Sequence, residues 1–314
     1  DDGGGDDDDD DGHAFGNFRR GLEKLPDSER ESLRREADAV ARRLDMTTAI
    51  MGPDHHTVAQ ECCYLATLHD RLGNGPTAIS LLTKAEKVME KTEDDTANLV
   101  FLGKLAETAL KFNDQNTVEK YAKKSLDLIN RKLEPEVRAN YLGPMLSLLG
   151  SARWHRGDDA QAAKDFEEVI RLTGDSKEEK LLVFRYRCRS ALGVIAKRSN
   201  DLPLAIERFN AAIADVEAQA QIPVTEAAQD YLNLSHLLMD QKRHKEAIKP
   251  LKRWLAMCEE RKVPAAEHVA PLSLLADAYH VLGDKDTSAM YGERMYAVSY
   301  PDSHAFMKTL AATK

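Results

Sequence analysis

Small and apolar residues recur at helical intervals between residues 57 and 91. The recurrence stops at residues 73–76, where the sequence is Gly-Asn-Gly-Pro, and then resumes. Spacings of three and four place side chains on one face of an α-helix. The pattern therefore predicts two amphipathic helices joined by a tight turn. The residues expected to face each other are Cys62, Leu65, Ala66 and His69 in the first helix, and Ala78, Leu82 and Ala85 in the second.

One helical hairpin cannot cover both of its faces, so it needs further hairpins stacked against it. The chain supplies them, because a leucine followed thirteen residues later by a second landmark residue occurs six times. Successive copies start 40, 44, 43, 42 and 41 residues apart. Such a period predicts an all-α array of antiparallel helix pairs. The landmark pairs are Leu65 and Ala78, Leu105 and Val118, Leu149 and Ala162, Leu192 and Ala205, Leu234 and Ala247, and Leu275 and Ser288.

The bend between the two helices of each copy has its own signature. Gly or Asn, which adopt a left-handed backbone easily, occupies this place in five copies, and Lys242 replaces them in the fifth. The second helix of the fifth copy also contains Pro250, which should remove one helical hydrogen bond and bend that helix. The Gly and Asn residues are Gly73, Asn113, Gly157, Asn200 and Gly283.

The segments around the copies differ from them in composition. Residues 1–27 begin with an acidic Gly/Asp run that we expect to be disordered, and continue as a short docking segment. Residues 28–51 are predicted to form a capping helix, equivalent to half a repeat, with Asp27 or Ser28 as its N-cap. The six hairpins are expected in residues 52–300. Residues 301–314 are expected to form a tail or a short capping helix.

These landmarks resemble the tetratricopeptide repeat (TPR) pattern, in particular Leu149, Gly150, Gly157, Ala162 and Phe166 in the third copy and Leu192, Gly193, Ala205, Phe209 and Ala212 in the fourth. The resemblance covers residues 54–299 and implies a right-handed superhelical solenoid that binds protein partners. The period near 42 residues and the leader Gly52-Pro53-Asp54-His55 resemble the kinesin light chain subgroup. Chaperone-binding TPR proteins clamp a carboxylate with Lys and Asn, which the matching positions here lack, so a co-chaperone role is not expected.

Charge is distributed unevenly along the chain. Of the net charge of −9, the aspartates Asp1, Asp2 and Asp6 through Asp11 contribute −8, which leaves −1 for the rest. The four cysteines are too few and too scattered for a disulfide framework, so we expect an intracellular reducing compartment. The cytoplasm is the first choice, and an organelle interior remains open. The chain starts with Asp, so we expect a fragment or a processed form, and no apolar run is long enough to span a membrane.

The chain carries no motif for catalysis or cofactor binding. Phosphate loops and nucleophile elbows are missing, so we expect neither an enzyme nor a cofactor. His55, His56 and His69 near Cys62 are residue types that ligate zinc, but their spacing separates them by several helical turns. Helix capping and solvent exposure explain these histidines better than a metal site.

The candidate binding surface is the concave groove that the resemblance implies, lined by the first helix of each pair. The predicted helix over residues 181–198 carries five basic residues. These could bind an acidic protein or peptide, because a guanidinium group can form two hydrogen bonds with one carboxylate. A solvated basic face explains the same residues. The candidate partner-binding residues are Trp154 as an apolar anchor, His155, Arg185, Arg187, Lys197, Arg198 and His236.

Three alternatives stay open at this point. The acidic run Asp6 through Asp11 could occupy the groove within the same molecule, or it could serve only solubility. The chain could be a structural or assembly-factor subunit of a larger complex that uses its convex surface. It could also be an RNA-binding helical repeat, although a pI near 5.6 makes nucleic acid an improbable partner.

Overall fold

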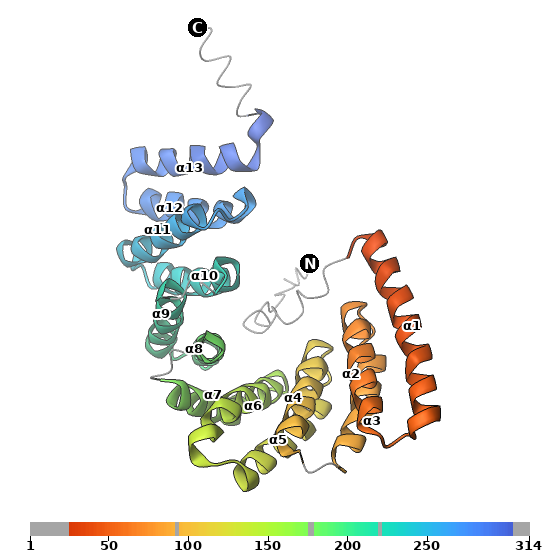
Figure 1. Cartoon of the computed structure of the whole chain (residues 1–314). Coiled ribbons are helices and arrows are strands. Elements are labelled where there is room, and N and C mark those ends of the chain that lie inside the picture. The colour runs from red at the N-terminus through yellow and green to blue at the C-terminus, as the bar shows by residue number, and fades with distance from the viewer. Residues whose placement is uncertain (1–24, 92–93, 175–178, 219–221, 304–314) are drawn as a thin grey trace, which may run out of the picture. The chain divides into compact units, whose positions relative to one another are not determined.

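The computed structural model describes residues 25–91, 94–174, 179–218 and 222–303. Every regular element in these ranges is a helix, and consecutive helices pair in antiparallel fashion (Figure 1). The expected all-α solenoid class is therefore confirmed. The acidic run, the docking segment expected up to residue 27 and the expected C-terminal tail lie largely outside the described residues.

The chain forms two compact units, and the boundary between them in the sequence falls within helix α8 (Glu179–Arg198). The first unit ends at Cys188 and the second begins at Arg189. The sequence pattern predicts one array over residues 52–300 and contains no sign of this division. Those sequence-based boundaries stay a prediction.

The first unit contains a single helix followed by three helical hairpins. Helix α1 packs against the first hairpin, and each hairpin packs against the next. The helices are α1 (Asp27–Met51), α2 (His56–Arg71) with α3 (Gly75–Met89), α4 (Asp95–Lys111) with α5 (Gln115–Lys132), and α6 (Pro135–His155) with α7 (Asp159–Thr173).

The second unit contains the rest of α8 and the helices that follow it. A short 3₁₀ helix, which the sequence pattern does not predict, precedes α12. The helices are α9 (Leu202–Ala218), α10 (Val224–Asp240), α11 (His244–Glu260), η3 (Ala265–His268), α12 (Val269–Val281) and α13 (Lys285–Ser299).

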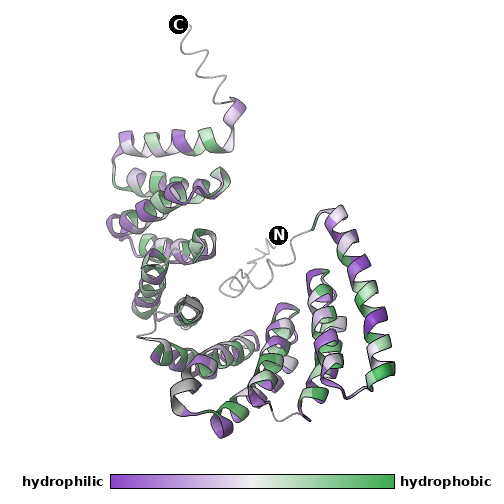
Figure 2. Ribbon diagram, in the orientation of Figure 1, coloured by the Kyte–Doolittle hydropathy of each residue, from purple (hydrophilic) through white to green (hydrophobic). Residues whose placement is uncertain are grey.

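The landmark residues of the repeat form the core of the hairpins. All six landmark leucines are buried, and so are five of the six residues found thirteen positions later. The exception is Ser288, which is half-buried and donates its hydroxyl to the Ala276 carbonyl at 2.9 Å. Figure 2 shows hydrophobic and hydrophilic residues on different sides of the same helices. The spacing of thirteen therefore marks the place where the two helices of a hairpin touch.

Two glycines of the repeat let the paired helices come close together. A Cβ atom added at Gly150 would lie 2.7 Å from the Phe166 ring, and one at Gly193 would lie 2.7 Å from the Phe209 ring. Both rings are fully buried, so they have little room to move. Gly at these positions is therefore a requirement of packing.

The six inter-helix bends share one backbone hydrogen bond, and in four of them an aspartate carboxylate also caps the second helix. Asn113 has φ 61°, and the next residue, Asp114, donates its N–H to the Ala109 carbonyl and accepts the Thr117 N–H with its carboxylate. The first bond ends one helix and the second caps the next. The expected left-handed residues are confirmed, and Lys242 adopts the same conformation with φ 59°. Pro250 lies inside α11, as expected.

Candidate partner-binding surfaces

Polar contacts connect the first helices of successive hairpins. In the first unit, Lys111 of α4 reaches both carboxylate oxygens of Asp70 on α2 at 3.0 Å. In the second unit, Ser190 of α8 donates to Asp230 of α10 at 2.6 Å. Lys197 of α8 donates to Asn233 of α10 at 3.2 Å. The paired residues lie 41, 40 and 36 positions apart in the chain, and their contacts tie α2 to α4 and α8 to α10.

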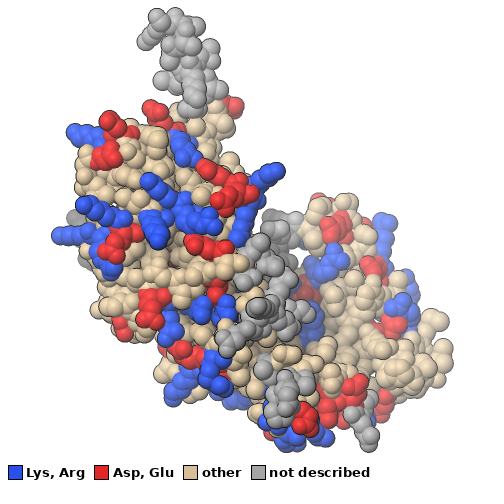
Figure 3. Space-filling model, turned by 60° about the vertical axis from the view of Figure 1, so that its left-hand side comes forward, with Lys and Arg blue, Asp and Glu red and all other residues tan. Residues whose placement is uncertain are grey.

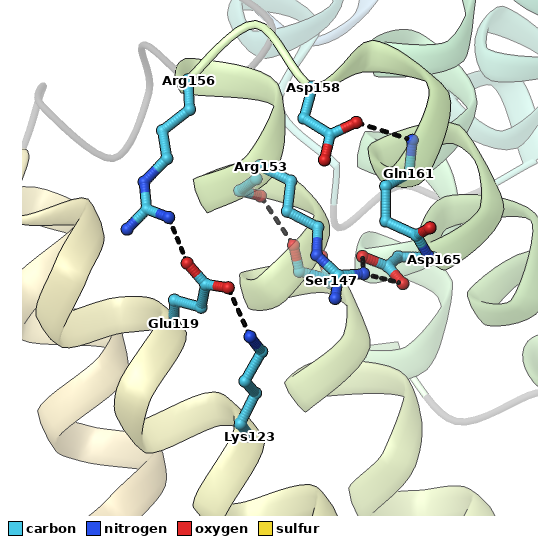
Figure 4. Close-up of polar contacts among 9 residues, drawn as sticks. Glu119, Lys123, Ser147, Arg153, Arg156, Asp158, Gln161 and Asp165 are labelled. Carbon is cyan, nitrogen blue, oxygen red and sulfur yellow. Dashed lines mark hydrogen bonds and ion pairs between the residues drawn. The ribbon is translucent and has the colours of Figure 1, made fainter.

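A second network in the first unit surrounds the end of α6 (Figure 4). Arg156 reaches back to α5, where it pairs with Glu119, and Glu119 also accepts from Lys123 at 2.5 Å. Arg153 of α6 donates to Asp165 of α7 at 2.7 Å, within its own hairpin. Burial raises the pKa of the Asp165 carboxyl group, and the Arg153 guanidinium opposes this effect. The arginines at this helix end are therefore engaged in holding helices together.

Four of the seven candidate residues belong to the first unit. Trp154 is 4% exposed, so its indole is part of the packed interior and offers almost no surface to a partner. His155 next to it is exposed, and the two rings lie 5.3 Å apart. Arg185 donates to the Gly174 carbonyl at 3.0 Å and thereby caps the end of α7. Arg187 is half-buried.

The other three candidate residues belong to the second unit. Lys197 and Arg198 are exposed at the end of α8, and His236 is exposed on α10. Lys197 is held beside Asn233 by the contact described above. Arg189, another basic residue of α8, pairs with the buried Asp215 of α9 at 2.8 Å and is committed to its own hairpin. The basic residues of α8 thus divide into structural and exposed ones.

Sequence reasoning missed a basic surface on α11. Six of the twelve residues from position 242 to 253 are Lys or Arg. Four of them are exposed, and Figure 3 shows Lys and Arg side chains gathered on the unit that contains this helix. A count of charges in short windows would have found this run. The exposed residues are Lys242, Lys245, Lys249 and Lys252.

The described residues contain no group of three side chains able to hold a metal ion. The Nδ1 atom of His55 accepts the N–H of Thr57 at 3.2 Å, so this histidine caps α2. The four cysteines are free thiols. None of the described helices combines the length and the apolar character that crossing a membrane requires.

Comparisons with known proteins show which solved structures have a similar fold. A scan against models of protein families finds no match, and a comparison with curated sequences finds none either. Among solved structures, the chain is similar to a signal transduction ATPase with a tetratricopeptide repeat sensor from Pyrococcus horikoshii. The TM-score is 0.63 and the identity 18%, and the match covers 82% of this chain but only 38% of that protein.

Two further solved structures match this chain over most of their own length. RapI in its apo form gives a TM-score of 0.56 at 13% identity, with 77% of this chain and 97% of that chain covered. PilF of Pseudomonas aeruginosa gives 0.50 at 16% identity, with 83% and 99% covered. At these identities the likeness concerns the fold alone. The chain therefore has the fold of a TPR-type helical repeat.

Proposed function

We propose that the chain is a non-enzymatic interaction scaffold or adaptor. Its partner is a protein or an acidic peptide, bound on the first helices of the hairpins. The main support is the α8 and α10 surface of the second unit, where two polar contacts align the two helices. Exposed Lys197, Arg198 and His236 provide donors for carboxylates beside these contacts. We leave Trp154 out of this surface because it is buried.

The proposal includes three finer points. The repeat length near 42 residues and the Gly52-Pro53-Asp54-His55 leader support a repeat of the kinesin light chain type. Four free thiols support a reducing compartment, with the cytoplasm as the first choice. The TPR part of the Pyrococcus horikoshii ATPase is described as a sensor, and a sensor also recognises a partner.

Charge reversal on α8 tests the surface. The partner is first captured from the native source with the full chain and identified by mass spectrometry. Its affinity for the K197E/R198E variant should then fall about tenfold or more, because carboxylate contacts are lost and like charges are introduced. The matched control is K262E/K285E, which changes two exposed lysines of the same unit. R187E is measured separately because Arg187 belongs to the first unit.

Two outcomes separate the possible functions. Equal affinity of wild type and K197E/R198E would mean that the partner does not bind the α8 and α10 surface. This result would favour a structural or assembly-factor subunit that binds elsewhere. Loss of binding in K262E/K285E as well would mean that only net charge matters. A salt titration with RNA on filters tests the nucleic acid alternative, which a pI near 5.6 disfavours.

We also propose that Asp6 through Asp11 compete with the partner for the basic surface. These residues lie outside the described part of the chain, and the support is charge alone, since they carry most of the net charge of −9. Tethering gives such a segment an effective concentration on the order of mM. Deleting residues 1–12 should therefore strengthen partner binding at low salt and change it little at high salt. Unchanged affinity at low salt would remove this competition.

A further inference from the structure

A cleft on the second unit lies between α9 and α11, the second helices of two successive hairpins. Its volume is about 480 Å³, which is within the usual range of ligand sites. None of the candidate residues of the α8 and α10 surface lines it. The lining residues are Asn210, Ile213, Ala214 and Glu217 from α9, and Lys249, Pro250, Lys252 and Arg253 from α11.

The charges around the cleft are mostly positive. Three of its lining side chains are cationic and one, Glu217, is anionic. Glu217 is already engaged, since it accepts the Tyr231 hydroxyl at 3.4 Å and lies 3.7 Å from Arg253. Within the described residues Lys249 has no ion-pair partner. Lys252 lies over the Tyr279 ring at 5.4 Å, with no carboxylate partner in the same ranges. Among the residues that the structure describes, no carboxylate therefore pairs with these two ammonium groups of the cleft.

The floor of the cleft is apolar and well supported. Ile213, Ala214 and Pro250 supply its hydrocarbon surface. Tyr231 of α10, whose hydroxyl reaches the lining residue Glu217, stacks on Trp254 of α11 with the ring centroids 5.6 Å apart. Pro250 has no N–H to donate, so the Glu246 carbonyl one turn earlier loses its helical partner. A ligand here meets hydrocarbon at the bottom and positive charge at the rim.

The basic rim continues beyond the cleft along α11. Lys245, Lys249 and Lys252 follow one another at intervals of four and three, so they share one exposed face of α11, and Lys242 is exposed in the bend just before this helix. Arg243, which is half-buried, pairs with Glu246 at 2.8 Å and is not part of this stripe. An extended ligand with several carboxylates can therefore contact the stripe over about two helical turns.

We propose that this cleft is a second binding site, independent of the α8 and α10 surface, and that it takes an acidic peptide with an apolar side chain among its carboxylates. The apolar side chain fills the floor at Ile213 and Ala214, and the carboxylates meet Lys249 and Lys252. Nucleic acid fits less well, because the lining contains no aromatic side chain on which a base could stack.

Labelled synthetic peptides and the full chain provide the test. The probe is a fluorescent peptide with one central leucine flanked by glutamates, and fluorescence anisotropy measures its affinity. A peptide with glutamines in place of the glutamates, one with alanine in place of the leucine and an RNA oligonucleotide of equal length serve as comparison ligands. Wild type should bind the first peptide best and lose affinity as salt rises.

Two variants locate the binding. K249E/K252E should weaken the first peptide about tenfold or more. A214W should weaken it similarly while keeping every charge, because the indole fills the floor at an exposed position of α9. K262E/K285E, with the same change in net charge, should bind like wild type, and so should K197E/R198E. Circular dichroism and thermal melting check that all variants are folded.

Four results would overturn the proposal. These are wild-type affinity in folded K249E/K252E, wild-type affinity in A214W, equal losses in K262E/K285E, or tighter binding of RNA than of the acidic peptide in competition. Loss of binding in K197E/R198E alone would mean that the peptide binds the α8 and α10 surface and not the cleft.

Discussion

Ser190 and Asp230 face each other across the contact between α8 and α10, with the hydroxyl donating to the carboxylate at 2.6 Å. Ser190 is 3% exposed and Asp230 is 2% exposed. A carboxylate removed from water this completely needs its hydrogen-bond donors. The pair therefore fixes how one hairpin of the second unit sits on the next.

Replacing Ser190 by Ala should destabilise the second unit by about 1–3 kcal/mol, because the buried carboxylate loses a donor that water cannot replace. Urea unfolding followed by circular dichroism measures the change in free energy of unfolding. S199A is the control, since Ser199 is exposed and its hydroxyl donates to the Ala196 carbonyl only three residues earlier in the chain. Equal stability of S190A and S199A would show that this hydrogen bond does not hold the hairpins together.

Gly193 and Gly292 should respond to alanine in opposite directions. G193A places a methyl group 2.7 Å from the buried Phe209 ring and should cost about 1–3 kcal/mol through overpacking. Gly292, inside α13, has no atom within 4 Å of an added Cβ, so G292A should stabilise by up to about 1 kcal/mol through helix propensity. Thermal melting of the two variants gives the sign directly. A stable G193A variant would mean that α8 and α9 can move apart at no cost.

Features set by contacts within one hairpin were predictable from the sequence. The interval from Leu192 to Ala205 reflects two helices and a bend of fixed length, and the Asn200-Asp201 bend carries its own stop and cap signals. Both depend on neighbours near in sequence. The same spacing puts Lys242 at the bend position of the fifth copy. The structure gives it a left-handed backbone although lysine rarely adopts one, because the length of the bend is fixed.

Features that depend on the next hairpin were not predictable. Whether Trp154 points inward or outward depends on the helices packed around it, and the structure buries it. Arg185 looked like a ligand-binding residue, but it caps α7. The cleft at Pro250 arises between two helices more than thirty residues apart in the chain, so no local pattern marks it. Only its basic residues were visible in the sequence.

The cysteine thiols should react slowly in the folded protein. Burial raises the pKa of the Cys63 thiol to about 12 and that of Cys188 to about 12, and it raises the pKa of Cys62 and Cys258 as well. The thiolate is the reactive form, and it is scarce at neutral pH when the pKa is this high. Iodoacetamide should therefore label these residues at least about tenfold more slowly in native protein than in urea, as read by mass spectrometry. Rapid native labelling of Cys188, which is fully buried, would mean that α8 opens readily.

The Glu119 carboxylate should make the stability of the fold depend on pH. Hydrogen bonding from Lys123, with the charge of Arg156 nearby, lowers the pKa of the Glu119 carboxyl group below its ordinary value of 4.5. An acid whose pKa is lower in the folded state stabilises the fold above its unfolded pKa, and this contribution disappears as pH falls through the folded pKa. The E119Q variant should therefore be less stable than wild type at neutral pH, by less than about 1 kcal/mol because the contact is near the surface.

The difference in free energy of unfolding between wild type and E119Q should shrink as the pH is lowered from 7 to below about 4, because protonation of Glu119 removes the same contacts. Urea titrations at a series of pH values measure it. The control is E207Q, which replaces an exposed glutamate with no ion pair in the described residues and should stay within about 0.5 kcal/mol of wild type at each pH. A difference for E119Q that is constant with pH would mean that Arg156 and Lys123 do not interact with the charged carboxylate, and that the link from α6 back to α5 depends on other contacts, such as the hydrogen bond from Arg156 to Asn116.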